Sequence, residues 1–371
     1  MAAGPLMSRG RRWLAAVILA MLAAPALGML AAPYETVSVM ERRTLAPPPA
    51  APADAKGWAL LPRGLDAWFG DHFAWRGPLV RAAFTLQSRA GLRPSAGVQA
   101  VRGKGDWLLL QQGLMGAAGA ETDPAAARRY GAFVCAVQEE ARARGARFLF
   151  APAPSTLEVY PETAPDWLKL ARPTQPGLVL DAARACGAQT LDLRPAMLAA
   201  KPQGPGSLGE PLYQRHDSHW TNAGALVAFN AVAGALGQPD WAIDARSLGW
   251  RPGKPFDSDL VRLAGAFDLP QELAPEPPEG PSVAPETGRQ RDLARPPYPP
   301  PFVAPAARAR PVVLVIGDSY TADFWPPYFR RAGVTLAWSN QAECRFDRRI
   351  YDRVKPDIVV LAPVSRLEAC R

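Results

Sequence analysis

The amino-acid sequence predicts an α/β protein with a doubly wound fold and a parallel central sheet. The run Val312–Ile316 is apolar and β-branched, as is typical of a strand buried on both faces of a parallel sheet. Other short apolar runs alternate with segments of helical periodicity, the order found in βα repeats. Of the 371 residues, 48% are hydrophobic and 20% are charged, which excludes a wholly disordered chain and a polytopic membrane protein.

Periodic apolar positions predict the helices, and apolar runs predict the strands. Helices are expected around residues 65–84, 130–137, 178–185 and 225–236, the last entered through Thr221 as its N-cap. Residues 103–110 are expected to form a turn and then a strand. Further strands are expected at residues 147–151, 190–193, 312–316, 334–338 and 357–361.

The N-terminal residues 1–32 predict export. Arg9, Arg11 and Arg12 precede an apolar run at residues 13–30, and this order is typical of export signals. The run is longer than most signal-peptide cores and shorter than an ideal spanning helix, so a cleaved signal and a retained signal anchor both stay open. Either interpretation places the rest of the chain in the periplasm, secreted or anchored to the inner membrane.

Proline marks the boundaries of the remaining chain. A proline-rich linker is predicted at residues 33–62, because the run Pro47–Pro52 favours a stiff, extended backbone. The α/β domain is then predicted at residues 63–371. Within it, residues 270–311 are rich in proline and lack periodicity, so a long loop insertion is expected there instead of a folded element.

Four cysteines and the net charge bear on the compartment and the partners. In an exported chain we expect disulfides, because they persist in oxidising compartments. Of three possible connectivities we favour Cys135–Cys186 with Cys344–Cys370, and buried free thiols are the alternative. The net charge of +8 indicates attraction to anionic surfaces or polymers. It is weak evidence for nucleic acid, and no nucleic-acid partner is expected.

A candidate nucleophile directly follows the strand at residues 312–316, in the segment Gly317-Asp318-Ser319-Tyr320. Parallel strands carry their active groups at their carboxyl ends. Gly317 permits a tight turn at that point. Ser319 would then stand at the tip of the turn, with backbone N–H groups nearby for an oxyanion hole.

A serine nucleophile needs a base, and the chain contains three histidines. His219 lies two residues after Asp217, and in an extended segment such side chains share a face. Asp217 would hold the Nδ1–H of His219 and leave Nε2 free for Ser319. On this interpretation His216 points the other way, and His72 packs in the early helix.

Each of these two motifs is weak alone, since Gly-Asp-Ser occurs in ordinary turns and Asp-x-His in surface turns and helix caps. Their combination in an exported α/β chain with few histidines favours a Ser-His-Asp triad. A metal site using Asp217 and His219 is the chemical alternative. It lacks a third ligand at a recognisable spacing, so neither a metal nor a cofactor is expected.

At these residues the sequence resembles the SGNH hydrolase-like family of the alginate O-acetyltransferases AlgX and AlgJ. That family is similar to a circularly permuted SGNH esterase, in which an Asp-x-His-Trp motif precedes the Gly-Asp-Ser motif. This chain has the same order, with residues 217–220 before residues 317–319. Five further segments resemble the family: Glu41-Arg42-Arg43, Trp68–Phe73, Gly105–Leu108, Val159–Glu162 and Asp257–Leu260.

The resemblance implies an SGNH-hydrolase-like fold and an exported O-acetyltransferase acting on a cell-surface or secreted, alginate-like polysaccharide through an acetyl-serine. Carried across by position, Ser319 is the nucleophile, His219 the general base and Asp217 the residue that orients it. Tyr320 and Trp220 are candidates for lining the acyl or sugar site, with core packing as the alternative.

The resemblance also implies a partner, a membrane-bound O-acyltransferase that supplies acetyl groups. Two other functions stay open at this point. A carbohydrate esterase would use the same triad with water as the acceptor. A non-catalytic scaffold of an exopolysaccharide biosynthesis complex would not use the triad at all.

Overall fold

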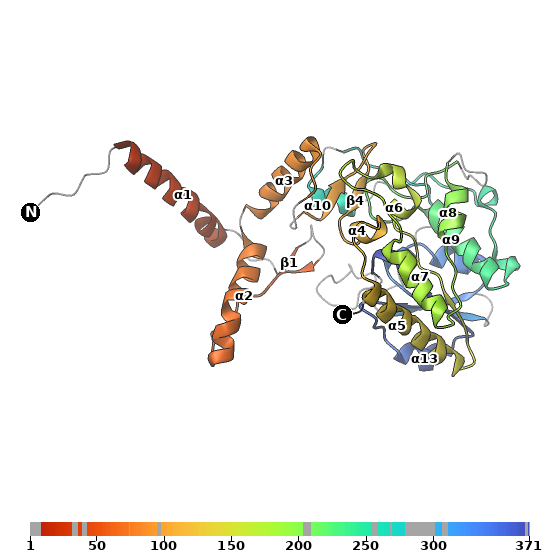
Figure 1. The fold of residues 1–371 in the computed structure, drawn as a ribbon. Helices are drawn as coiled ribbons and strands as arrows, with labels where there is room; N and C mark the ends of the chain where they lie inside the picture. The colour runs from red at the N-terminus through yellow and green to blue at the C-terminus, as the bar shows by residue number, and fades with distance from the viewer. Residues whose placement is uncertain are drawn as a thin grey trace, which may run out of the picture. The chain divides into compact units, whose positions relative to one another are not determined.

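The computed structural model describes residues 9–31, 36–38, 43–73, 75–94, 98–202, 209–253, 258–267, 269–278, 301–305, 311–367 and 370. The chain divides into two compact units, residues 1–86 and residues 87–371 (Figure 1). The domain boundary expected at residue 62 therefore falls inside the first unit, within a helix.

The first unit consists of helices and one short hairpin. Its elements are α1 (Arg9–Ala31), β1 (Val37–Ser38), β2 (Arg43–Thr44), α2 (Ala55–His72) and α3 (Arg76–Ala90), which ends just past the unit's boundary. Asp54 caps α2 by accepting a hydrogen bond from the Gly57 N–H at 2.7 Å. His72 packs within α2 as predicted, with its ring stacked on Trp68. None of the helices in the described ranges has the length and apolar character needed to cross a membrane.

A five-stranded sheet organises the second unit, in the order β5-β9-β7-β8-β6. Its strands are β5 (Arg147–Phe150), β6 (Phe302–Ala304), β7 (Val312–Gly317), β8 (Thr335–Asn340) and β9 (Ile358–Ala362). Four of them run parallel, and β6 pairs with β8 in the antiparallel direction. A separate hairpin joins β3 (Ala100–Arg102) and β4 (Leu108–Leu110). The predicted parallel central sheet is confirmed, with an antiparallel strand added at one edge.

Two predictions about strands were wrong. Residues 302–304 form β6, although they lie in the segment expected to be a loop, because the Phe302 ring stacks on Trp338 of β8 at 5.5 Å. Residues 279–300 and 306–310 of that segment lie outside the described residues. The strand expected at residues 190–193 is reduced to a bridge between Thr190 and Phe150, since helix α8 begins at Arg194.

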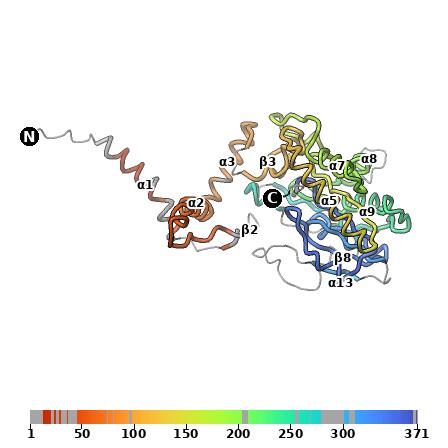
Figure 2. Tube along the Cα trace, turned by 60° about the horizontal axis from the view of Figure 1, so that its bottom comes forward, coloured from red at the N-terminus to blue at the C-terminus, as the bar shows by residue number. Residues whose placement is uncertain are grey.

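Helices cover both faces of the sheet. The helices of the second unit are α4 (Leu114–Ala117), α5 (Pro124–Arg142), α6 (Thr156–Val159), α7 (Gln175–Ala185), α8 (Arg194–Ala200), α9 (Asn222–Ala235), α10 (Asp259–Ala264), α11 (Ser319–Ala322), α12 (Pro326–Arg331) and α13 (Arg349–Val354). Along β7, Val313 and Val315 pack into the core that contains α9 and α12. Leu314 and Ile316 face the opposite core, which contains α5 and α7. These two helices run side by side (Figures 1 and 2).

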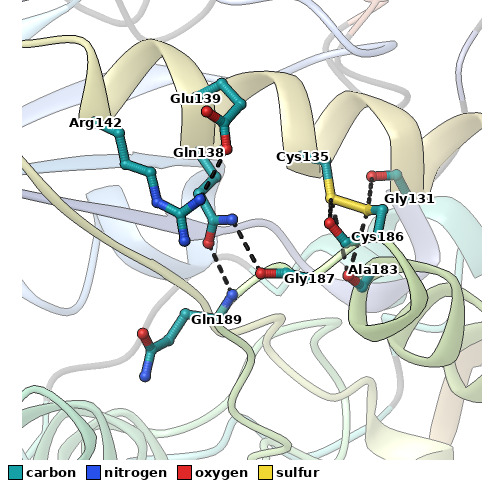
Figure 3. The surroundings of a disulfide bond; sticks show 9 residues. All are labelled: Gly131, Cys135, Gln138, Glu139, Arg142, Ala183, Cys186, Gly187 and Gln189. Atoms are coloured by element: carbon teal, nitrogen blue, oxygen red, sulfur yellow. Dashed lines mark hydrogen bonds and ion pairs between the residues drawn. A yellow bond between two sulfur atoms is a disulfide. The ribbon is translucent and has the colours of Figure 1, made fainter.

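Both predicted disulfides are present. Cys135 of α5 bonds to Cys186 at the end of α7 (Figure 3), and Cys344 bonds to Cys370. Beside the first bond, the amide of Gln138 donates to the Gly187 carbonyl at 3.1 Å, and its oxygen accepts the Gln189 N–H at 2.8 Å. The covalent bond and the amide together fasten the end of α7 to α5.

Candidate active site

Ser319 lies at the carboxyl end of β7, a central strand with parallel neighbours on both sides. Asp318 caps the short helix α11 by accepting the Tyr320 N–H at 2.9 Å. Its second oxygen accepts the Val364 N–H at 2.6 Å, which joins the turn to the end of β9. Gly317 is required here, because a Cβ at this position would lie 2.9 Å from the Ala362 carbonyl oxygen. The strand and the cap thus fix Ser319 as the first residue of α11.

His219 lies in a tight reversal just before α9. Tyr213 and Trp220 form an antiparallel bridge, and the Gln214 N–H donates to the His219 carbonyl at 3.2 Å. Thr221 caps α9 as predicted, because its hydroxyl accepts the Gly224 N–H. The bridge and the cap hold the backbone on both sides of His219.

The three predicted catalytic side chains meet at hydrogen-bonding distance. His219 Nε2 lies 2.8 Å from Ser319 Oγ, across 100 residues of chain. His219 Nδ1 lies 2.6 Å from Asp217 Oδ1. A carboxylate only accepts hydrogen bonds, so the imidazole proton sits on Nδ1 and the Nε2 lone pair faces the serine hydroxyl. This arrangement is that of a serine nucleophile with its general base and an orienting acid.

The charges of this group support the same assignment. Burial disfavours the charge on Asp217, but the charge and hydrogen bond of His219, together with hydrogen bonding from Asp259, outweigh it and hold the pKa of Asp217 well below its ordinary value. Burial also opposes protonation of His219. The charge and hydrogen bond of Asp217 and the charge of Asp259 overcome that effect, so the pKa of His219 is raised. The pair therefore stabilises the imidazolium that forms when a serine is deprotonated.

Aromatic rings enclose the imidazole of His219. The Tyr320 ring lies 5.1 Å from it, and the Phe324 ring lies 5.9 Å from it and nearly parallel. Tyr320 and Trp220 are both 0% exposed. Of the two alternatives that the sequence left open for these residues, burial favours core packing over lining the acyl or sugar site, since a side chain without exposed surface contacts only protein. Phe324 keeps part of its surface exposed and is the aromatic neighbour of the base that the sequence reasoning missed.

Comparison with known proteins gives one family. The family described as SGNH hydrolase-like domain, acetyltransferase AlgX, matches residues 100–328, a stretch that includes Asp217, His219 and Ser319. The chain belongs to this family. It is accordingly an SGNH-type acetyltransferase by membership. No curated protein sequence matches the chain.

Solved structures share the fold at low sequence identity. A DHHW family protein from Eubacterium siraeum is 11% identical, with a TM-score of 0.52 over 75% of this chain and 94% of that one. PatB1 from Bacillus cereus, solved with a sulfonyl adduct, is 12% identical, with a TM-score of 0.50 over 71% and 93%. The O-acetyltransferase domain of Pseudomonas putida AlgJ is 19% identical, with a TM-score of 0.44 over 72% and 91%. The first two likenesses agree with an SGNH-hydrolase-like α/β fold.

In this AlgX-type site the structure adds Asp259, which the sequence reasoning had not assigned a role. Its backbone N–H donates to Asp217 Oδ2 at 2.8 Å, and its carboxylate accepts the N–H and hydroxyl of Ser218 at 2.8 and 2.6 Å. The signal was present, because Asp259 falls in one of the segments that resemble the family. Sequence spacing alone did not bring it to Asp217, which lies 42 residues earlier.

Arg366 is the second addition to the site. Its guanidinium donates to Tyr320 Oη at 3.0 Å, to the Ser218 carbonyl at 3.4 Å and to the Ser218 hydroxyl at 3.3 Å. No motif pointed to Arg366, because it follows the last strand. Its neighbour Ser365 accepts a hydrogen bond from the Ser155 N–H at 3.2 Å. Arg366 therefore brings a cation from the C-terminal end of the domain to the site.

Asp259 also supplies the third ligand that a metal site lacked in the sequence. Ligand atoms of Asp217, His219 and Asp259 lie within 4.8 Å of one another. However, His219 Nδ1 carries the proton donated to Asp217, and Nε2 faces Ser319. The imidazole therefore directs no lone pair toward the two carboxylates, and the hydrogen bonds favour a triad over a metal centre.

The remaining predicted residues lie as follows. Asp318 holds the turn, as expected of a structural partner, and burial raises its pKa. His216 is buried away from Ser319, with Nδ1 3.2 Å from the Pro270 carbonyl oxygen. Of the three histidines, only His219 is hydrogen-bonded to the serine.

Proposed function

We propose that this protein is an exported O-acetyltransferase that adds acetyl groups to hydroxyls of a cell-surface or secreted polysaccharide through an acetyl-Ser319 intermediate. The observation that carries the proposal is the continuous line of hydrogen bonds from Asp217 through His219 to Ser319, at 2.6 and 2.8 Å. Membership of the AlgX acetyltransferase family supports acetyl as the transferred group.

In the first half-reaction Ser319 takes the acetyl group. His219 Nε2 accepts the hydroxyl proton as Ser319 Oγ attacks the carbonyl carbon of the acetyl donor. The Ser319 N–H, at the start of α11, is one donor to the oxyanion of the tetrahedral intermediate. When that intermediate collapses, the bond to the donor breaks, and the departing oxygen takes the proton from His219. Asp217 stabilises the imidazolium between these two proton transfers.

In the second half-reaction a sugar hydroxyl replaces the donor. His219 removes the hydroxyl proton as the sugar oxygen attacks the acetyl-serine carbonyl. Ser319 then leaves and regains a proton from His219, and the acetyl ester of the sugar is released. The same residues act in both halves, so the enzyme returns to its starting state without any other reactant.

The acceptor, the donor and the compartment rest on indirect support. The names AlgX and AlgJ among the relatives support a polysaccharide acceptor, and the net charge of +8 suits an anionic polymer. By family analogy a membrane-bound O-acyltransferase supplies the acetyl group. Arginines ahead of the apolar run at residues 13–30 support export to the periplasm, secretion or attachment to the inner membrane.

A carbohydrate esterase is the second candidate, because water can occupy the place of the sugar hydroxyl in the same triad. Product analysis separates the two functions: an esterase releases free acetate, whereas a transferase acetylates an added oligosaccharide. The third candidate, a non-catalytic scaffold, predicts that Ser319→Ala leaves polymer acetylation unchanged while loss of the chain abolishes it.

The test is intact mass spectrometry of the purified protein after incubation with an activated acetyl ester. We expect a gain of about 42 Da, one acetyl group in place of one proton, on the wild type and not on Ser319→Ala. Ser247→Ala, which removes an exposed hydroxyl, is the matched control and should keep the adduct. PatB1 was solved with a sulfonyl adduct, so a sulfonyl fluoride is a suitable second probe. The absence of both the adduct and ester cleavage in the wild type would contradict the proposed function.

A further inference from the structure

Ser218, the residue between Asp217 and His219, is held at every polar atom. Its N–H and hydroxyl donate to the Asp259 carboxylate at 2.8 and 2.6 Å. Its carbonyl accepts hydrogen bonds from Tyr320 Oη and from Arg366 Nη1. Because Ser218 links the acid to the base, any rotation of its backbone would separate the two.

Asp259 reaches Asp217 as well as Ser218. Its backbone N–H donates at 2.8 Å to the Asp217 oxygen that does not face His219. Asp217 is thereby fixed at both oxygens, which leaves its carboxylate one orientation toward the imidazole. Asp259 Oδ2 also lies 4.0 Å from His219 Nδ1, close enough for its charge to act on the ring directly.

Arg366 is placed by its backbone neighbours. The Val364 N–H donates to Asp318, and the Ser365 N–H donates to the Ala153 carbonyl at 2.9 Å. The Arg366 backbone also abuts Gly113, where a Cβ would come within 3.0 Å of the Arg366 Cα. Three elements therefore converge to aim one guanidinium at Ser218 and Tyr320.

We propose that Asp259 and Arg366 are positioning residues of this active site, which fix the segment Asp217–His219 through Ser218 and act with opposite sign on the charge of His219. The inference rests on the proposed function, because it concerns the base of the same triad. It assigns these residues no contact with the substrate.

The opposite signs follow from the charges around the imidazole. The charged and titratable groups that face His219 are Asp217 of its own segment, Asp318 and Tyr320 of the β7–α11 turn, Asp259 of α10 and Arg366 after β9. Loss of the Asp259 charge destabilises the imidazolium, and loss of the Arg366 charge stabilises it. A residue that served only to hold the backbone would change the rate without moving the pH dependence.

The experiment measures kcat/KM for an activated acetyl ester against pH in Asp259→Asn, Arg366→Met and the double variant. Activity requires neutral His219, so it falls on the acidic side of the profile. We expect the midpoint of that fall to move to lower pH in Asp259→Asn and to higher pH in Arg366→Met, by about 0.5 unit or more. The double variant should return toward the wild-type midpoint. Each single variant should also lose about tenfold to a hundredfold in kcat through misplacement of the base.

Three matched variants separate charge from packing. Ser218→Ala removes the shared hydroxyl without changing charge, so kcat should fall with the midpoint unmoved. Arg366→Lys keeps the charge and should keep the midpoint, although an ammonium cannot reproduce the forked contacts. Asp166→Asn removes an exposed carboxylate, 91% accessible, and should change neither quantity.

A readout without catalysis completes the test. NMR titration of the three histidine rings, with His219 identified by its loss in His219→Ala, gives the His219 midpoint directly. The inference would be overturned if the His219 midpoint stayed unmoved in both Asp259→Asn and Arg366→Met. It would also be overturned if the midpoint moved in the same direction in both variants. If the wild type shows no Ser319-dependent ester cleavage, the proposed function fails, and the NMR midpoints still decide the inference.

Discussion

The indole N–H of Trp220 donates to the backbone carbonyl of Tyr320 at 3.0 Å. Each of these residues directly follows a member of the triad, Trp220 after His219 and Tyr320 after Ser319. One buried hydrogen bond therefore joins the segment that carries the base to the helix that carries the nucleophile, across 100 residues of chain. Trp220 thus lies in the core, which was one of the two alternatives that the sequence had left open for it.

This relationship predicts the effect of Trp220→Phe. The substitution keeps an aromatic ring but leaves the buried Tyr320 carbonyl without its donor, which costs about 1–3 kcal/mol of unfolding free energy. Urea denaturation measures the loss. Trp58→Phe, at an indole that is 64% exposed, is the control and should change stability by less than about 0.5 kcal/mol. Equal stability of the two variants would show that the hydrogen bond from Trp220 to the Tyr320 carbonyl does not stabilise the fold.

Removal of triad members should give a recognisable pattern of rates. His219→Ala and Ser319→Ala should each lower ester cleavage by about 10³- to 10⁶-fold, and the double variant should be no worse, because the residues act as a unit. Asp217→Asn should cost about 10⁴-fold, since the imidazole loses its orienting acceptor. His72→Ala, in the first unit, serves as the control. Additive losses in the double variant would argue against a shared mechanism.

The raised pKa of His219 predicts the pH dependence of activity. The imidazole must be neutral to accept the serine proton, so kcat/KM should rise with pH through a midpoint above about 6.5, the reference value for histidine. A profile that is flat from pH 5 to 9 would exclude His219 as the base.

The same pair predicts the pH dependence of stability. A raised folded pKa means that the His219 contribution is fully present below the unfolded pKa and is lost as pH rises through the folded value. The lowered pKa of Asp217 has the opposite consequence. Its contribution is present above about pH 4 and is lost as the pH falls toward the folded value. Melting temperatures of the wild type and Asp217→Asn between pH 2 and 8 check both signs.

The bond between Cys135 and Cys186 closes a loop with a sequence separation of 51 residues. We expect the double substitution to serine to lower the unfolding free energy by about 2–4 kcal/mol, mainly through a freer unfolded chain. Denaturant unfolding measures the loss of unfolding free energy. The wild type under reducing conditions gives a second measurement without the disulfide. A midpoint equal to that of the oxidised wild type would show that the disulfide is dispensable.

Much of the central sheet was predictable, because local patterns carry it. The run Val312–Ile316 is apolar on both sides, since β7 has helices on both faces and strands at both edges. Thr221 marked the start of α9 through its capping side chain. The strand expected at residues 190–193 failed because only Thr190 forms a bridge to Phe150 of the edge strand β5 before helix α8 begins at Arg194.

The triad was predictable for a similar reason. Asp217 and His219 are two residues apart, and Ser319 follows a buried parallel strand, so two short patterns placed all three residues. The segment around Asp217 and His219 is a tight bend, where the sequence had predicted an extended backbone. For Tyr320 and Trp220, which flank the triad, the sequence left two alternatives open, a place lining the acyl or sugar site and packing in the core. Sequence proximity does not show which face of the backbone a ring occupies, and both rings are turned into the core.

The sequence by itself predicted the alternation of strands and helices, favoured the two disulfide pairs that the structure contains, and pointed to Ser319 as the nucleophile and His219 as the base. These depend on periodicity, caps and spacing, which are properties of short segments. Only the tertiary structure decided that Asp259 holds Asp217 and that Arg366 reaches Ser218, 148 residues away. A polar side chain has no local signature for a distant partner, because its partner is chosen by how the completed elements pack.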